Sequence, residues 1–283
     1  MVRQPITIPS ILGRKKSGKK LVALTGYDYS FARILDTTEI DIVLVGDSLG
    51  MVSLGYENTL PVTMDEMVAH TRAVKRGLNN PLLVSDMPFM SYQVSVEQAV
   101  ANAGRLIQEG RAEAVKLEGG IPVCEKVQAI DQAGVPVMGH VGLTPQRVHQ
   151  FGGYKVQGKN YIDARQIKQD AKALQQAGVF SVVLEGIPGE LAGEITRELK
   201  IPTIGIGAGK DCDGQILVIH DMLGLNSEFT PKFVKQYAKL ESQIQSAVAD
   251  YIQEVRSGDF PGEEQTYSTE RKSLRKVDRN ECS

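Results

Sequence analysis

The sequence has few cysteines and lacks any long hydrophobic run. Its three cysteines are scattered over 283 residues without C-x-x-C spacing, which argues against a disulfide framework or a zinc site and favours a reducing compartment. No apolar stretch approaches the ~20 residues that span a bilayer, and the opening segment contains no signal-peptide core. We therefore expect a cytoplasmic protein with no membrane segment.

A strong excess of charge is absent as well. The formal net charge is −2 at pH 7, so we expect neither nucleic acid nor an anionic membrane as a partner. The dense basic run RKKSGKK, at 14–20, is typical of a solvent-exposed face, and a phosphate site is the alternative.

What the sequence does contain is a repeated alternation of strand-like and helix-like segments. Eight Val/Ile-rich runs occur at 21–27, 40–45, 81–84, 112–120, 135–140, 179–185, 201–206 and 214–220. Between them lie helical segments that often end at glycine, and Thr63 with Glu66 forms a capping-box pattern. This alternation predicts an α/β fold with a parallel sheet. Eight units over about 230 residues favour a (β/α)8 TIM barrel, and an open doubly wound sheet is the alternative.

We expect a single domain with a polar extension. The barrel and a C-terminal helix, which we predict from Pro231 to about Val255, would occupy residues 1–256. Residues 257–283 are polar and are predicted to form a flexible tail. The irregular segment 141–160 is long enough to be a lid or binding loop.

Polar side chains stand at the ends of most predicted strands. In a barrel these ends face one mouth, where active sites lie. Strand alternation places Lys116 and Glu118 on one face. If Val43 and Val45 line the interior, the same parity would put Asp47 at its rim. The residues so placed are Asp28, Asp47, Ser48, Asp86, Lys116, Glu118, His140 and Glu185.

Three of the acids are candidates for a metal site. Asp47, Asp86 and Glu118 would repel one another in a small mouth unless a cation were present. Mg²⁺ prefers carboxylate, water and substrate oxygens, so we predict that these acids bind Mg²⁺ directly or through water. The alternative for each acid is a helix cap.

Other residues have two open interpretations. Glu185 is a candidate general base or an ion-pair partner of Lys116, and Lys116 is a candidate for binding a substrate carboxylate. The glycine-rich segment 205–210 would bind phosphate or form a tight turn. His140 is a candidate site residue and His70 a structural one, whereas His149 and His220 stay undecided.

The ordered motifs of the chain resemble the ketopantoate hydroxymethyltransferase family. They cover roughly 7–254, with Gly26 where the family usually has alanine: TGYD (25–28), LVGDSLG (44–50), LGYENTLPVT (54–63), SDMPF (85–89), VKLEGG (115–120), GHVGLTPQ (139–146), LEGIP (184–188), GIGAG (205–209) and CDGQ (212–215). The resemblance implies a Mg²⁺-dependent barrel that assembles as a homo-oligomer, in much of the family a homodecamer. The implied reaction transfers a one-carbon unit from 5,10-methylenetetrahydrofolate to 3-methyl-2-oxobutanoate, giving 2-dehydropantoate for pantothenate biosynthesis through a Mg²⁺-stabilised enolate.

The resemblance also implies residue roles. Asp47 and Asp86 match metal ligands that also contact the substrate, and Glu118 matches the third acid of that site. Glu185 matches the proposed base. The remaining matches are to groups that hold the keto acid or line its pocket: Ser48, Lys116 and His140.

Two alternatives remain open on the sequence alone. One is a Mg²⁺-dependent lyase or mutase of the phosphoenolpyruvate mutase and isocitrate lyase type, which usually carries a catalytic cysteine near the mouth. Cys124 falls in a predicted helix and Cys212 follows the seventh predicted strand. The other alternative is a barrel that binds a keto acid without catalysis.

Overall fold

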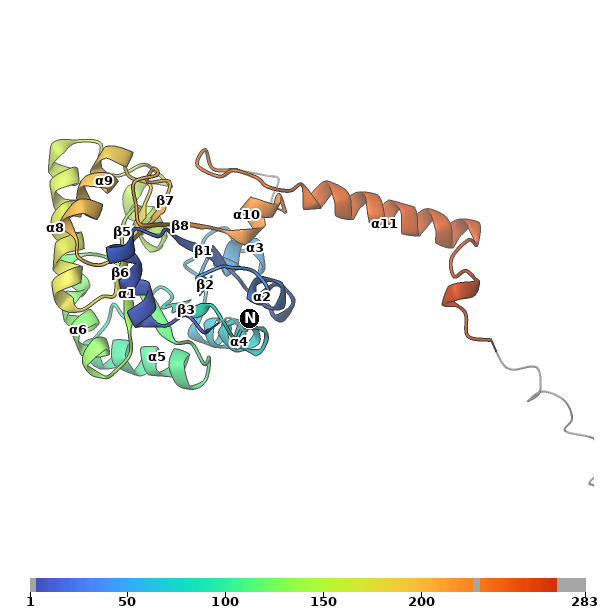
Figure 1. Ribbon diagram of the computed structural model, residues 1–283, viewed down its shortest axis with the longest axis horizontal. Coiled ribbons are helices and arrows are strands. Elements are labelled where there is room, and N and C mark those ends of the chain that lie inside the picture. The colour runs from blue at the N-terminus through green and yellow to red at the C-terminus, as the bar shows by residue number, and fades with distance from the viewer. Residues whose placement is uncertain (1–3, 226–229, 269–283) are drawn as a thin grey trace, which may run out of the picture. The chain divides into compact units, whose positions relative to one another are not determined.

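The computed structural model contains a closed barrel of eight parallel strands (Figure 1). It describes residues 4–225 and 230–268. Strand β1 pairs with both β2 and β8, so the sheet has no open edge and the predicted TIM barrel is confirmed over the doubly wound alternative. The strands are β1 (Leu21–Thr25), β2 (Ile42–Val45), β3 (Leu82–Asp86), β4 (Ala114–Glu118), β5 (Val137–Gly142), β6 (Ser181–Glu185), β7 (Thr203–Ile206) and β8 (Gly214–Leu217).

Helices cover the outside of the barrel between successive strands, except that residues 207–213 join β7 to β8 without a helix (Figure 1). The capping box of Thr63 and Glu66 forms as predicted and starts one of them. The helices of this part of the chain are α1 (Ile8–Ser17), α2 (Tyr29–Asp36), α3 (Leu49–Val52), α4 (Met64–Gly77), α5 (Val96–Gln108), η1 (Ile121–Val123), α6 (Cys124–Gln132), η2 (Pro145–Arg147), α7 (Val148–Phe151), α8 (Tyr161–Ala177), α9 (Gly189–Glu198) and α10 (Ile219–Leu223).

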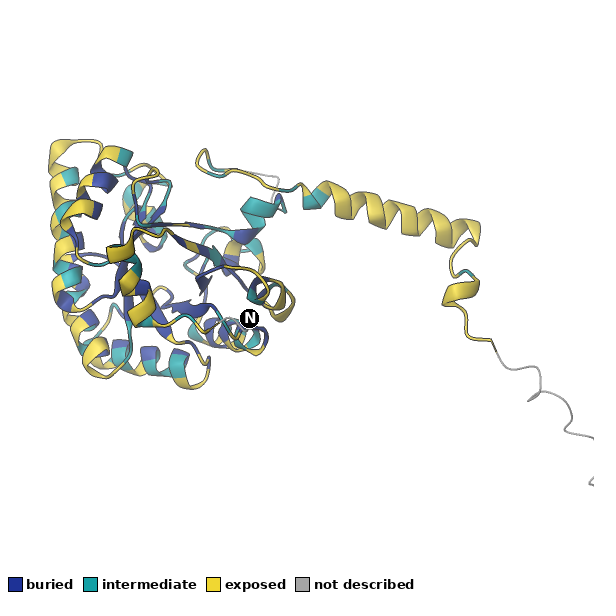
Figure 2. Ribbon diagram, in the orientation of Figure 1, coloured by how far each residue is buried: buried dark blue, intermediate teal, exposed yellow. Residues whose placement is uncertain are grey.

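The strands bury apolar side chains on both faces, and most of the strand ribbon is dark blue, the colour of buried residues, in Figure 2. An inner cluster fills the barrel with residues such as Leu44, Val84 and Val183. A larger outer cluster lies between strands and helices. Asp86 and Glu185 have the parity of the inner residues of their strands, so their predicted inward placement agrees with the structure.

The prediction for β2 was wrong in detail. Val43 and Val45 pack in the outer cluster, while Ile42 and Leu44 line the barrel interior. Asp47 does not continue the alternation because the chain leaves the strand after Val45 and enters a tight turn. It therefore reaches the mouth through this turn.

The basic run is largely exposed, as predicted, with Arg14 and Lys15 half-buried. Its first residues belong to helix α1, whose Ile11 is fully buried in the inner cluster. Arg14 pairs with Asp41 at 2.7 Å, and Lys15 pairs with Asp213 at 2.8 Å. These acids directly precede β2 and β8, so α1 covers the N-terminal ends of the strands, opposite the mouth.

The chain divides into two compact units, Met1–Tyr237 and Ala238–Ser283. The second contains α11 (Leu240–Ser257) and η3 (Glu263–Gln265). The helix predicted from Pro231 thus begins only at Leu240. The grouping of residues 1–256 as one domain stays a prediction, and most of the predicted tail, 269–283, lies outside the described residues. Across the described ranges, no helix has the length and apolar character needed to cross a membrane.

Candidate active site

A cavity of about 670 Å³ opens at the C-terminal ends of the strands. Its wall contains every residue to which the family resemblance assigns a role: Asp47, Ser48, Asp86, Lys116, Glu118, His140 and Glu185. The barrel thus brings side chains from five strand ends to one place, where barrel enzymes carry out their chemistry.

The sheet register decides which of these side chains are neighbours. Asp86 on β3 lies opposite Lys116 on β4, and Lys116 Nζ donates to Asp86 Oδ1 at 2.6 Å. The backbone N–H of Asp47 donates to Asp86 Oδ2 at 3.1 Å. Lys116 therefore pairs with Asp86, and the predicted alternative of a Lys116–Glu185 ion pair was wrong.

Next in the ring, the register places Glu118 opposite His140. His140 lies between two carboxylates, with Nδ1 3.5 Å from Glu118 Oε1 and Nε2 3.3 Å from Glu185 Oε2. Burial alone would lower the pKa of His140, but the two carboxylates outweigh burial and raise it to about 9. The two carboxylates thus favour the cationic form of the imidazole.

Lys116 and His140 offset only part of the negative charge of the buried acids. Burial, followed by repulsion from Asp86 and Glu118, raises the pKa of Asp47 well above its usual range. Burial also raises the pKa of Asp86, although Lys116 opposes this shift. Four acidic side chains face only two basic ones in this ring, Lys116 and His140, so a divalent cation would offset the excess of acids.

The donor set fits Mg²⁺ completed by water and substrate oxygens. No three Asp, Glu, His or Cys side chains within 4–225 and 230–268 are arranged to hold a metal ion by themselves. Mg²⁺ commonly takes only one or two carboxylates and keeps several waters. The raised pKa of Asp47 is the sign of a carboxylate that such a cation would stabilise.

Two residues of the site, Gln146 and Tyr27, were not among those predicted from the sequence. Gln146, 5% exposed, donates its Nε2 to Asp47 Oδ2 at 2.9 Å and its backbone N–H to Glu118 Oε2 at 3.1 Å. Tyr27 places its hydroxyl 2.8 Å from Ser48 Oγ. Both residues belong to the family motifs quoted above, and that was the available signal.

Several other candidates have structural roles. Asp28 caps α2 by accepting from the backbone N–H of Phe31. His70 Nδ1 lies 2.7 Å from the Tyr27 carbonyl, in line with its predicted structural role. His220 packs near the rings of Tyr27 and Phe31.

Residues of the glycine-rich segment 205–210 and of the irregular segment 141–160 also line the cavity. Gly207 has φ +60°, and a Cβ there would lie 2.8 Å from the ring of Phe233, so tight packing alone accounts for this glycine. The predicted 141–160 loop contains the short helices η2 and α7, and its Tyr154 and Lys155 line the cavity.

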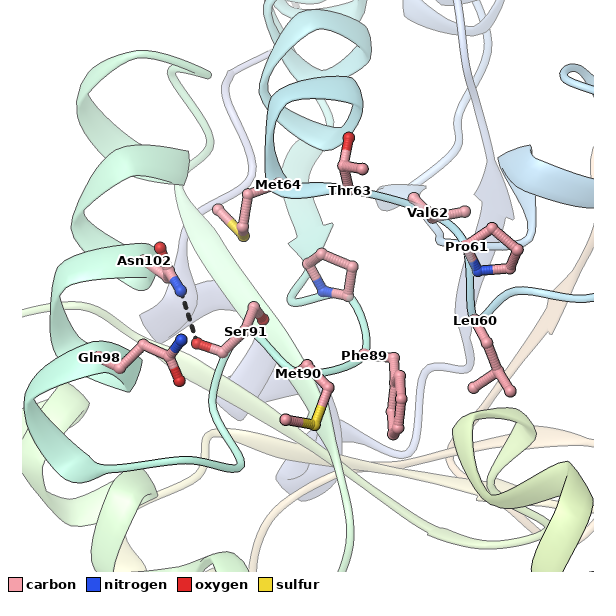
Figure 3. Close-up of a pocket in the computed structure, with 11 residues that line it drawn as sticks. Leu60, Pro61, Val62, Thr63, Met64, Phe89, Met90, Ser91, Gln98 and Asn102 are labelled. Carbon is pink, nitrogen blue, oxygen red and sulfur yellow. Dashed lines mark hydrogen bonds between the residues drawn. The ribbon is translucent and has the colours of Figure 1, made fainter.

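A second cavity of about 360 Å³ lies beside the start of α4 (Figure 3). Figure 3 shows Met64, Phe89 and Met90 around it, and Asn102 donating to the Ser91 carbonyl. No ionisable side chain lines this cavity. The chemistry of the described residues is therefore concentrated in the larger cavity.

An α/β barrel with buried acids and two basic side chains, Lys116 and His140, at its mouth has the features of an enzyme of the TIM-barrel class. Comparison with known proteins then shows the family. The model of the ketopantoate hydroxymethyltransferase family matches residues 5–263, and the chain belongs to that family of transferases.

Relatives support this assignment, and solved structures share the fold. Proteins named 3-methyl-2-oxobutanoate hydroxymethyltransferase from Syntrophus aciditrophicus and Enterococcus faecalis are each 58% identical to the chain, over 93% of it and 96% of their own length. A phosphonopyruvate hydrolase structure has a TM-score of 0.61 at 10% identity, covering 94% of this chain and 93% of that one. A 2,3-dimethylmalate lyase gives 0.58 at 13% identity, covering 93% and 89%. The likeness to these two structures shows the fold.

Proposed function

We propose that this enzyme transfers a one-carbon unit from 5,10-methylenetetrahydrofolate to 3-methyl-2-oxobutanoate as a hydroxymethyl group, with water supplying the hydroxyl, giving 2-dehydropantoate and tetrahydrofolate. The observation that carries the proposal is the convergence of Asp47, Asp86 and Glu118 with Lys116 and Glu185 on one cavity. Family membership supports the same reaction, because the relatives are named for it.

The polar wall suits a small 2-oxo acid. Lys116, 4% exposed, presents a positive charge to the substrate carboxylate while it remains paired with Asp86. Ser48 offers a hydroxyl to the same carboxylate, and Tyr27 holds that hydroxyl in place. When bound by Asp47, Asp86 and Glu118, directly or through water, Mg²⁺ would supply Lewis-acid stabilisation of negative charge on the keto oxygen.

Glu185 is the proposed base for the proton on C3. Its side chain is 16% exposed, more than that of Glu118 or Asp86, and it lines the cavity. His140 Nε2 lies 3.3 Å from the Glu185 carboxylate and would hold it in place to accept the proton. The resulting carbanion would form a C–C bond to the methylene carbon of the folate; the two C–N bonds of that carbon break, and water supplies the hydroxyl of the product.

The remaining cavity has room for the co-substrate. A volume of about 670 Å³ lies in the range typical of sites for drug-sized ligands, and a five-carbon keto acid fills only a fraction of it. Apolar and aromatic side chains such as Leu143, Tyr154 and Phe233 line the cavity and would exclude water from the carbanion.

The lyase alternative finds less support in the site. Cys124 and Cys212 are both absent from the cavity wall, and Cys212 is buried in the outer cluster. The described part of the chain therefore offers no cysteine at the mouth. We further propose a homodecamer in the cytoplasm, which native mass spectrometry and fractionation would test.

The test of the proposed reaction is a product assay with each substrate omitted in turn. We expect 2-dehydropantoate only when the keto acid, the folate and Mg²⁺ are all present. Product formed by bond cleavage without folate would favour the lyase reading instead.

A further inference from the structure

Gln146 joins the acids of the site through one short helix, η2. Its backbone N–H donates to Glu118 Oε2 at 3.1 Å, and its side-chain Nε2 donates to Asp47 Oδ2 at 2.9 Å. The same Nε2 donates to the carbonyl of Met87, which directly follows Asp86, at 3.0 Å. One residue thus contacts two of the proposed metal ligands and the backbone next to the third.

Tyr92 fixes which way the Gln146 amide faces. The backbone N–H of Glu118 donates to the Tyr92 hydroxyl at 3.1 Å, and that hydroxyl lies 2.7 Å from Gln146 Oε1. It also lies 3.1 Å from the Glu118 carbonyl, but its single proton goes to the shorter contact. Gln93 Nε2 donates to Gln146 Oε1 as well, at 3.2 Å.

The amide therefore has only one satisfactory orientation. With Oε1 receiving two donors, the NH₂ group must face Asp47 and the Met87 carbonyl, which act only as acceptors. This leaves Asp47 held through Oδ2. The structure shows no hydrogen bond at Asp47 Oδ1 from the residues it describes, so Oδ1 is the oxygen available to a cation.

We infer that Gln146, oriented by Tyr92, is a positioning residue that fixes Asp47 and Glu118 relative to each other for cation binding. The inference rests on the proposed function, because it gives the acids the role of holding Mg²⁺. Residues that orient metal ligands from behind commonly change metal affinity by about 10–100-fold when they are replaced.

A purely structural role for Gln146 would give a different result, and two Gln→Met variants separate the two roles. Gln146→Met removes the amide from the site. Gln175→Met is the matched control: Gln175 Oε1 accepts from the backbone of Lys200 and Ile201 at 2.6 and 3.3 Å, and it does not line the cavity. Both variants should lose some thermal stability.

The readout is metal binding to the full-length chain, with and without 3-methyl-2-oxobutanoate, by calorimetry with Mg²⁺ and electron paramagnetic resonance with Mn²⁺. We expect wild type and Gln175→Met to share one Kd, and Gln146→Met to bind about 10–100-fold more weakly. Tyr92→Phe, which removes only the hydroxyl, should weaken binding by a smaller factor. In the double variant Tyr92→Phe/Gln146→Met, the loss of binding free energy should be less than the sum of the two single losses, because Tyr92 acts partly through Gln146.

Equal metal affinity in Gln146→Met and Gln175→Met would overturn the inference and leave the proposed function intact. If Gln146→Met does not fold, an unchanged Kd in Tyr92→Phe overturns it in the same way. A wild-type chain that binds neither cation would instead overturn the proposed function together with the inference.

Discussion

Lys116 Nζ and Asp86 Oδ1 lie 2.6 Å apart, in an ion pair whose side chains are only 5% and 4% exposed. The pair is formed by neighbouring positions in the β3–β4 register. The pair opposes the rise in the pKa of Asp86 that burial causes, and it places the Lys116 ammonium in the wall of the cavity.

Replacement of Lys116 should separate substrate binding from metal binding. In Lys116→Met, we expect the keto-acid KM to rise at least about tenfold, since one charge-assisted contact of about 1.5–3 kcal/mol is lost. Affinity for Mg²⁺ should not fall, because a positive charge near the cation has been removed. The buried partner left behind should also cost about 3–5 kcal/mol of unfolding free energy, measured by urea denaturation.

Lys168→Met is the control for that experiment. Lys168 pairs with Glu194 and Glu198 on the surface, and such pairs contribute about 0–1 kcal/mol. A Lys116→Met enzyme with an unchanged KM would show that Lys116 does not hold the substrate.

Replacement of Glu185 should remove proton abstraction and keep binding. Glu185→Gln preserves the size of the side chain, so we expect keto-acid Kd to change little while kcat falls about 10²–10⁴-fold. Isothermal titration and steady-state kinetics measure the two quantities. Glu190→Gln, at an exposed position of α9, is the control, and a full-rate Glu185→Gln enzyme would exclude Glu185 as the base.

The N-terminal helix should stabilise the barrel through Arg14. Arg14 Nη2 donates to Asp41 Oδ1 at 2.7 Å, and Asp41 also accepts from the backbone N–H of Val22. Arg14→Met should therefore lower the free energy of unfolding by about 2 kcal/mol, whereas Lys16→Met, at an exposed position, should change it by less than about 0.5 kcal/mol. Equal losses of unfolding free energy in Arg14→Met and Lys16→Met, measured by denaturant titration, would show that the Arg14–Asp41 pair does not stabilise the barrel.

Stability should fall on mild acidification because of His220. Burial lowers the pKa of His220 below its ordinary value of about 6.5, so the unfolded chain binds a proton before the folded one does. This contribution is present above pH 6.5 and is lost as the pH falls toward the folded pKa, with a slope of at most about 1.4 kcal/mol per pH unit. His140 acts in the opposite sense and at higher pH, since its raised pKa adds stability that is fully present below about 6.5.

Unfolding measured between pH 5 and 6.5 should thus show a shallower slope in His220→Gln than in wild type. His149→Gln, on the short helix α7, serves as the comparison. If stability changes equally with pH in all three proteins, His220 does not cause the loss of stability at low pH.

The sequence was most informative where local chemistry decides the outcome. Alternating Val/Ile runs and helices predicted the barrel, and the Thr63–Glu66 pattern predicted a helix start that the structure confirms. Asp86 and Glu185 could be placed at the mouth because strand parity holds up to the ends of β3 and β6.

Relationships between distant segments could not be predicted in the same way. The partner of Lys116 depends on the β3–β4 register, which no local pattern reveals. Gln146 contacts Asp47, 99 positions away in the sequence, and its role depends on a buried hydroxyl from a third segment. The sequence around Ile11 is polar and gives no sign that this residue is buried, but α1 packs it into the inner cluster.

The most direct test of the central claim is hydrogen–deuterium exchange at C3 of 3-methyl-2-oxobutanoate, followed by NMR in D₂O without folate. We predict exchange with wild type and Mg²⁺, loss of exchange in EDTA, its return when Mg²⁺ is restored, and none with Glu185→Gln. Exchange at an undiminished rate in EDTA, or in the Asp47→Asn and Asp86→Asn variants, would contradict an acid-bound cation as the centre of this site.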